Sequence, residues 1–227
     1  MTDDLAGIQR FLDSGFKKEY ENFEAMKNYR ESRELCIRFF KLIREDMSIR
    51  SEERKKEMAA IMKHPLLTDE NNSLSVKAKS QFFYVMAKHS RMAGDMEQSY
   101  IFRKKHVALV EANPQFITES RMTYLRTLNN LLVAQYSLGK FEEMENTLDK
   151  VRRLQDGATL NEKLEALDIE FKISMGHYLD TFDFSGKEAN IAAIESQFNN
   201  YRAEIPAADI VLGDYYFMLY HYYRCLL

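Results

Sequence analysis

Five histidines and two cysteines are the side chains of this sequence best suited to bind a metal or to act as a nucleophile. His221 and Cys225 are four residues apart, which places both on one face of a helix, but a metal site needs three or four ligands. The sequence contains no His-Glu-x-x-His motif and no Cys-x-x-Cys pair. Cys36 and Cys225 stand among apolar neighbours, so we expect buried or half-buried thiols in a reducing compartment. We therefore expect no metal, no cofactor and a cytoplasmic location.

Other motifs of catalysis are absent or have a simpler interpretation. Neither form of glycine-rich phosphate-binding loop occurs, and there is no Gly-x-Ser-x-Gly nucleophile turn. The carboxylate pairs Glu52-Glu53 and Glu142-Glu143 stand beside basic residues, which is typical of a solvated helix face. The basic run from Arg103 to His106 lies between apolar residues, and we interpret it as the solvent face of one helix. We expect that the protein is not an enzyme.

The composition predicts a soluble, mostly helical protein. The chain has 227 residues, a formal net charge of −3 and 45% hydrophobic residues, which excludes a disordered chain. The near-neutral charge makes nucleic-acid binding an unfavourable interpretation, and two cysteines cannot form a disulfide framework. Only 3 prolines and 8 glycines are present, too few for the turns of a β-sandwich or barrel. No apolar stretch is long enough to span a membrane, and the acidic N-terminus does not resemble a signal peptide.

Prolines and glycines mark the breaks between the predicted helices. Pro65, Pro114 and Pro206 each lie between two long helical stretches, as expected of residues just past a helix end. Gly94 and Gly139 mark tight turns, where glycine can adopt the left-handed conformation, and they are 45 residues apart. Tight turns and longer loops that alternate at a steady period indicate stacked helical hairpins.

Steps of the same length from these two glycines reach turn-like segments at 183–186 and 47–51, and residues 14–16 form a further predicted tight turn. The predicted helices span residues 2–13, 16–30 with or without a continuation over 31–47, 51–63, 75–93, 95–111, 119–138, 141–155, 161–182, 187–203 and 207–225. The apolar spacing predicts that residues 122–138 pack on both sides and that residues 141–154 keep one face in solvent. Residues 69–75 form a predicted surface loop, with Ser75 or Ser73 as the cap of the next helix.

The turns and the residues before them resemble the tetratricopeptide repeat. That repeat has an apolar–small pair in its first helix, a Gly-Asp/Lys-Tyr/Phe turn and then a second helix. The matching segments are Met86-Ala87 before Gly94-Asp95-Met96, Leu131-Leu132 before Gly139-Lys140-Phe141, Met175-Gly176 before Asp183-Phe184, and Leu212-Gly213 before Tyr216. Leu132 and Met144 replace residues that are usually small, and the period exceeds the typical one of about 34 residues.

The resemblance implies an all-α fold, a right-handed superhelical array of antiparallel helical hairpins in a single domain over residues 1–227. Residues 1–70 are irregular N-terminal helices in this interpretation, residues 75–227 hold the clearer repeats, and the last repeat is incomplete. In such arrays the first helices of the hairpins line a concave groove. The positions that match this groove are Tyr84, Lys88, Arg91, Arg126, Asn129, Asn130 and Tyr136.

These side chains suit an extended peptide or its acidic end. Arginine and lysine pair with carboxylates, asparagine amides bond to a peptide backbone, and tyrosines supply a rigid amphipathic surface. The alternative is that they are ordinary polar residues on exposed helix faces.

The end of the sequence is unusually aromatic, with six aromatic side chains among residues 214–223. A solenoid normally ends in a helix with a polar outer face, because its last helix has no neighbour. We favour the interpretation that the chain belongs to a longer protein whose next helix would cover this surface. A symmetric homodimer through the C-terminal helix, with Tyr216, Tyr220 and Tyr223 in the contact, is the second interpretation. In the third, the helix folds back into the groove.

We therefore expect a non-enzymatic scaffold that binds a protein or peptide partner through a concave helical groove. The alternative is a regulatory sensor domain of a longer protein, in which a bound peptide or small molecule changes the curvature of the array. An attached effector domain, such as a DNA-binding helix-turn-helix, would favour the sensor, and the sequence shows none.

Overall fold

The computed structural model describes residues 2–45, 51–181 and 188–204, together with residues 213, 216, 217, 220 and 223. Within these residues the chain is helical, with ten α-helices, two short 3-10 helices and no strand, which confirms the predicted all-α class. The chain folds as two compact units, Met1–Leu109 and Val110–Leu227. A single array over residues 1–227 stays a prediction. None of the described helices combines the length and the apolar character that a bilayer span requires.

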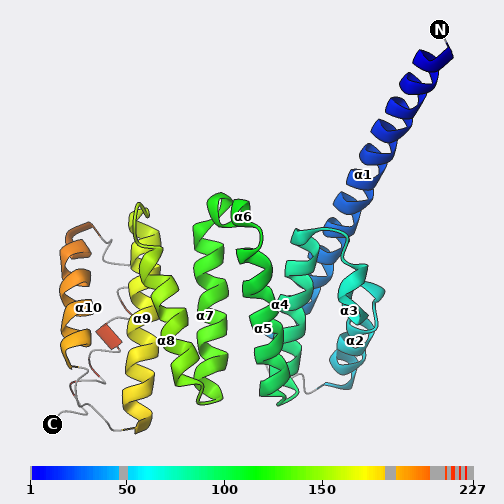
Figure 1. Ribbon diagram of the computed structural model, residues 1–227. Coiled ribbons are helices and arrows are strands. Elements are labelled where there is room, and N and C mark those ends of the chain that lie inside the picture. The colour runs from blue at the N-terminus through cyan, green and yellow to red at the C-terminus, as the bar shows by residue number, and fades with distance from the viewer. Residues whose placement is uncertain are drawn as a thin grey trace. The chain divides into compact units, whose positions relative to one another are not determined.

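The first unit is built on one long helix, α1 (Thr2–Glu45), which packs against α2 (Glu52–Met62) and α4 (Val76–Met92). The prediction of a tight turn at residues 14–16 is wrong, because the helix continues through Gly15 without a left-handed residue. Glycine inside a helix costs only about 1 kcal/mol, which a long helix tolerates. The N-terminal half of α1 extends away from the other helices of its unit (Figure 1).

The C-terminal half of α1 supplies much of the core of this unit. It packs with α2, α4 and the short helix α3 (Pro65–Thr68). The buried apolar residues are Leu35, Cys36, Phe39, Leu42, Ile43, Met58, Ile61, Leu66, Leu67, Phe82, Phe83 and Val85. Cys36 is a buried free thiol, as predicted, and burial raises its pKa to about 11. Cys225 lies outside the described residues.

The predicted loop at residues 69–75 contains a 3-10 turn, Glu70–Asn72, and is fastened to α1. The Asn28 amide donates to the Asn72 carbonyl at 2.8 Å and accepts from the backbone N–H of Leu74 at 3.0 Å. Of the two predicted caps, Ser75 is confirmed, since its side chain accepts from the third backbone N–H of α4 at 3.1 Å.

Helices α4 and α5 (Met96–Glu111) form an antiparallel hairpin. Its turn contains Gly94, whose φ of 82° confirms the predicted left-handed residue. The Ser99 hydroxyl is buried and donates to the Ala87 carbonyl at 2.8 Å. Such a short side chain lets the two helices approach closely, and Phe102 packs nearby against two phenylalanines of α4. The last two residues of α5 belong to the second unit.

The second unit consists of helices that pack against their neighbours along the chain. Its elements are α6 (Pro114–Glu119), α7 (Arg121–Ser137), α8 (Phe141–Arg153), α9 (Leu160–Thr181), α10 (Glu188–Tyr201) and a 3-10 turn, Arg202–Glu204. Helix α7 contacts both α8 and α9, so the prediction that it packs on both sides is confirmed. Gly139 has a φ of 66° at the α7–α8 turn, as predicted. Helix α8 buries only Met144, Thr147, Leu148 and Val151, which agrees with the predicted single buried face.

Two boundaries differ from the sequence prediction. Pro114 occupies the first turn of the short helix α6, where proline is well tolerated, so this connection is helical and not a plain loop. Ser120 then caps α7, which begins at Arg121. The predicted turn at 183–186, Pro206, and most of the predicted helix 207–225 lie outside the described residues.

Candidate functional site

The predicted residues of the first unit lie on one face of α4. Tyr84, Lys88 and Arg91 follow each other at intervals of four and three residues, which is the spacing of one helix face. The tyrosine ring is about one-third exposed and stacks on Phe40 of α1, with ring centroids 4.7 Å apart and an angle of 22° between the planes. This contact holds the ring in one orientation.

Helix α5 adds two residues that the sequence interpretation missed. The run from Arg103 to His106 is not a single solvent face, because Arg103 and His106 are buried while Lys104 and Lys105 are exposed. Four consecutive residues are spread over most of the circumference of a helix, so some of them must face inward. That geometric limit is the signal that sequence analysis could have used.

Lys88 and Arg91, both cationic, lie within electrostatic range of Arg103, and the charged form of Tyr84 acts on it with the opposite sign. Burial and the charge of Arg91 lower the pKa of Arg103 to about 10, which leaves it protonated at neutral pH. Burial, together with Arg91 and Arg103, also lowers the pKa of Lys88. We call Lys88, Arg91 and Arg103 the cationic cluster. Among the described residues no ion pair joins any of the three to a carboxylate. The cluster can therefore attract a negatively charged group.

His106 is the neutral member of this neighbourhood. Burial and the nearby Arg103 lower its pKa to about 4. Its Nε2 atom lies 2.7 Å from the Ser80 hydroxyl of α4, and its ring lies 6.5 Å from that of Tyr84. At neutral pH His106 thus adds a hydrogen bond between the helices and no charge.

The predicted residues of the second unit are used differently. Arg126 lies on α7 and pairs with Glu165 of α9, with 3.7 Å between the charged atoms. The Tyr136 hydroxyl donates to the Gly176 carbonyl at 2.8 Å, so this side chain joins α7 to α9. Asn129 and Asn130 are half-buried and make no hydrogen bond through their side chains to another described residue. The asparagines therefore keep their amides available, while Tyr136 has a structural role.

The second unit also contains an open hollow of about 330 Å³. It is lined by Glu111, Ile117, Tyr124, Lys150, Arg153 and Leu154. The Glu111 carboxylate accepts from the Tyr124 hydroxyl and from the Lys150 ammonium, both at 2.6 Å. Burial and this hydrogen bond raise the pKa of Tyr124. The Glu111 carboxylate is therefore already neutralised by Lys150 and accepts two hydrogen bonds. Its role in the hollow is to stabilise the contacts between the helices.

Two sets of large apolar side chains are exposed. Phe16, Tyr20, Phe23 and Met26 form a stripe along α1, within the predicted helix over residues 16–30. The predicted self-association residues Tyr216, Tyr220 and Tyr223 are also exposed. Arg202 donates to the Tyr216 hydroxyl at 3.1 Å, and the Tyr223 hydroxyl donates to Glu195 at 3.3 Å. Self-association through these tyrosines stays a prediction.

Within the described part of the chain, no group of three or more histidine, cysteine, aspartate or glutamate side chains is placed to hold a metal ion. The cationic cluster beside Tyr84 is therefore the best candidate site. Comparison with family models, with curated proteins and with solved structures finds no match to this chain.

Proposed function

We propose that the protein is a tetratricopeptide-like scaffold that binds an extended, acidic segment of a protein partner. In this proposal the hairpins α4–α5 and α7–α8 are repeats of a right-handed superhelical array, and α4 and α7 are the first helices that face the ligand. The positive φ values at Gly94 and Gly139, which end α4 and α7 in equivalent turns, support this assignment.

The observation that carries the proposal is the face of α4. The opposite side of this helix is buried, with Phe82, Phe83 and Val85 in the core. The outward side offers a tyrosine ring held by stacking, followed by Lys88 and Arg91. An aromatic platform next to two cations suits a peptide that carries carboxylates, because the ring can pack against its chain while the cations neutralise its charge.

Fluorescence anisotropy with a labelled peptide rich in glutamate and aspartate tests this function. The matched probe replaces every carboxylate by its amide, and we expect it to bind much more weakly. Lys88→Ala and Arg126→Ala should each weaken binding of the acidic peptide by about three- to tenfold, since each removes one charged contact. Circular dichroism should show that both variants remain helical.

Lys41→Ala is the control for a general loss of positive charge, because Lys41 is exposed on α1 and carries the same charge. It should bind the acidic peptide as the wild type does. Unchanged binding in both Lys88→Ala and Arg126→Ala would exclude the predicted groove residues as the peptide site.

A further inference from the structure

Arg103 is a buried charge that the described residues leave without a counter-charge. The residue is only 6% exposed. No hydrogen bond or ion pair of the described residues involves its guanidinium, whereas Lys105, two positions away, pairs with Glu70 at 3.0 Å. A guanidinium carries five N–H donors and rarely becomes buried without a partner. Arg103 therefore has N–H donors that the described residues do not bond. None of its nitrogens is among the fully buried atoms without a partner, so the narrow exposed part of the guanidinium is open to water or to a ligand.

The hairpin holds Arg103 beside the middle of α4, between the turns that carry Ser80 and Ala87. On α5, Ser99 bonds to an α4 carbonyl at 2.8 Å, and His106 lies 2.7 Å from a serine hydroxyl of α4. Arg103 lies between these two contacts, about one helical turn from each. Lys88 and Arg91 lie close enough for the charges to act on one another. The backbone around Arg103 is thus held by contacts on both sides, and the side chain itself is buried.

The other groups placed near Arg103 are a histidine and a tyrosine, and neither is a carboxylate. His106 is neutral at physiological pH and hydrogen-bonded to α4. Tyr84 offers a phenol hydroxyl, which is not a carboxylate. Three cations that repel one another at a partly desolvated position favour a bound anion strongly, because each attraction is screened less than in water.

We infer that Arg103, Lys88 and Arg91 form an oxyanion-binding site, in which the buried guanidinium of Arg103 anchors a carboxylate or a phosphate group. The planar guanidinium can donate two parallel hydrogen bonds to either group, and the two outer cations complete the neutralisation. This inference rests on the proposed function in one respect, the source of the oxyanion. That source would be an acidic or phosphorylated side chain of a partner. The exposed edge of the cluster, at Lys88 and Arg91, is where that group would enter.

Thermal unfolding of the full chain tests the site with the simplest probes, inorganic phosphate and acetate. Each anion is titrated at constant ionic strength, with sodium chloride replaced by the anion as its concentration rises. General screening of charges is then the same at every point. We expect a saturable rise of the melting temperature with phosphate, with acetate or with both, because a ligand of the folded state stabilises it by mass action. A response to phosphate alone assigns a phosphorylated ligand, and a response to acetate alone assigns a carboxylate.

Arg103→Met should weaken the apparent affinity for the active anion by at least about tenfold. Arg103→Lys keeps the charge but loses the planar pair of donors, so it should retain part of the affinity. Arg33→Met is the matched control, an exposed arginine of the same unit, and should respond as the wild type does. Line broadening of the phosphate signal in ³¹P NMR, lost in Arg103→Met, provides a second measurement that does not depend on unfolding.

No saturable response to either anion, or an equal response in Arg103→Met, would overturn the site. The two proposals can fail separately. Anion binding that needs Arg103, without any binding of the acidic peptide, would leave the oxyanion site standing and refute the proposed function. If the acidic peptide binds equally well to Arg103→Met, the proposed function stands and the oxyanion site is refuted.

Discussion

Arg103 in the first unit and Arg152 in the second show two ways in which one residue type is used. Both are placed by a helix of a hairpin and both are at least partly withdrawn from water. Arg152 is surrounded by carboxylates, whereas Arg103 has two other cations near it and no carboxylate among the described residues.

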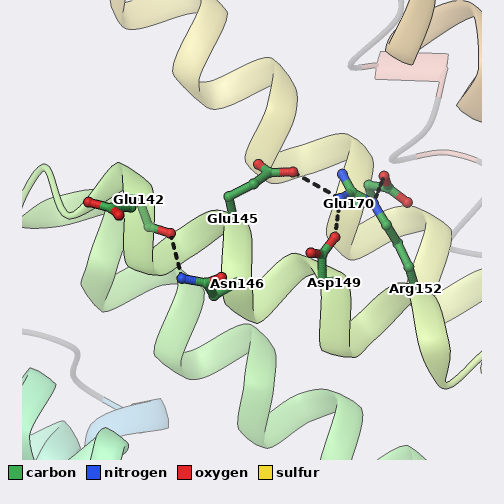
Figure 2. Close-up of polar contacts among 6 residues, drawn as sticks. All are labelled: Glu142, Glu145, Asn146, Asp149, Arg152 and Glu170. Carbon is green, nitrogen blue, oxygen red and sulfur yellow. Dashed lines mark hydrogen bonds and ion pairs between the residues drawn. The ribbon is translucent and has the colours of Figure 1, made fainter.

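The surroundings of Arg152 fully account for its charge. Its Nε atom bonds to Glu170 at 2.6 Å, and its Nη1 atom bonds to Glu145 and Asp149, both at 2.8 Å (Figure 2). Burial opposes the charge, but the hydrogen bonds to these carboxylates outweigh it and raise the pKa of Arg152. Glu170 comes from α9 and the other two acids from α8, so the arginine joins the two helices. This is the arrangement of a structural arginine.

The partners of a charged residue distinguish a structural charge from a binding charge. A charge that the fold uses brings its acceptors with it, as Arg152 does. A charge kept for a ligand remains incompletely paired until the ligand arrives, and the folded protein is less stable for it. On this criterion Arg103 is a binding residue. Mutation of either arginine and a change of pH test this contrast.

Arg152→Met should destabilise the protein by about 2–3 kcal/mol. The change leaves three acids without their common partner, one of them Glu170, which is mostly buried. Removing one member of a buried pair costs about 3–5 kcal/mol, and the partial exposure of Arg152 reduces this value. Urea unfolding followed by circular dichroism measures the change. Glu170→Gln, which keeps the shape of the acid, should have a smaller effect, and a neutral outcome for Arg152→Met would remove one side of the comparison.

Acid should destabilise the first unit through His106. The pKa of this histidine is about 4 in the folded protein and about 6.5 in an unfolded chain, so below pH 6.5 the unfolded state binds a proton that the folded state does not. Stability therefore falls as the pH decreases from about 6.5 to about 4. A single group with this shift contributes about 2 kcal/mol of loss between pH 7.5 and pH 5.

His106→Gln isolates this contribution, because glutamine can still bond to the Ser80 hydroxyl but does not titrate. The free energy of unfolding of the variant should change less between pH 7.5 and pH 5 than that of the wild type. Equal changes in both proteins would mean that burial and the charge of Arg103 do not lower the pKa of His106.

Local features of the sequence were sufficient for most of the helices. Ser75, Gly94 and Gly139 act through their own backbone and close neighbours, so the cap and the two hairpin turns could be predicted. Gly15 shows the limit of the same reasoning, because glycine permits a turn without requiring one. Whether the chain turns there depends on what the neighbouring residues pack against, which local spacing does not contain.

The candidate site was only half predictable, for a related reason. Lys88 and Arg91 are outward residues of α4, and their position follows from the helical spacing alone. The burial of Arg103 depends on the α4–α5 contact, and the role of Tyr136 depends on a hydrogen bond to a residue 40 positions away. Contacts between helices decide which polar residues face a partner and which hold the fold together, so these two assignments needed the structure.

The smallest predicted effect is also the one that most directly tests the comparison. In a buffer that contains chloride but no phosphate or acetate, Arg103→Met should raise the free energy of unfolding by about 1 kcal/mol. The reason is that an apolar side chain of similar length replaces an incompletely paired charge. Urea unfolding under the conditions used for Arg152→Met gives the two values side by side, and their signs should be opposite. Saturating amounts of the oxyanion identified above should remove the advantage of the variant, since only the wild type gains stability from the ligand. A loss of stability in Arg103→Met without any anion would show that the guanidinium already has a partner in the fold, and Arg103 would then belong with Arg152 as a structural residue.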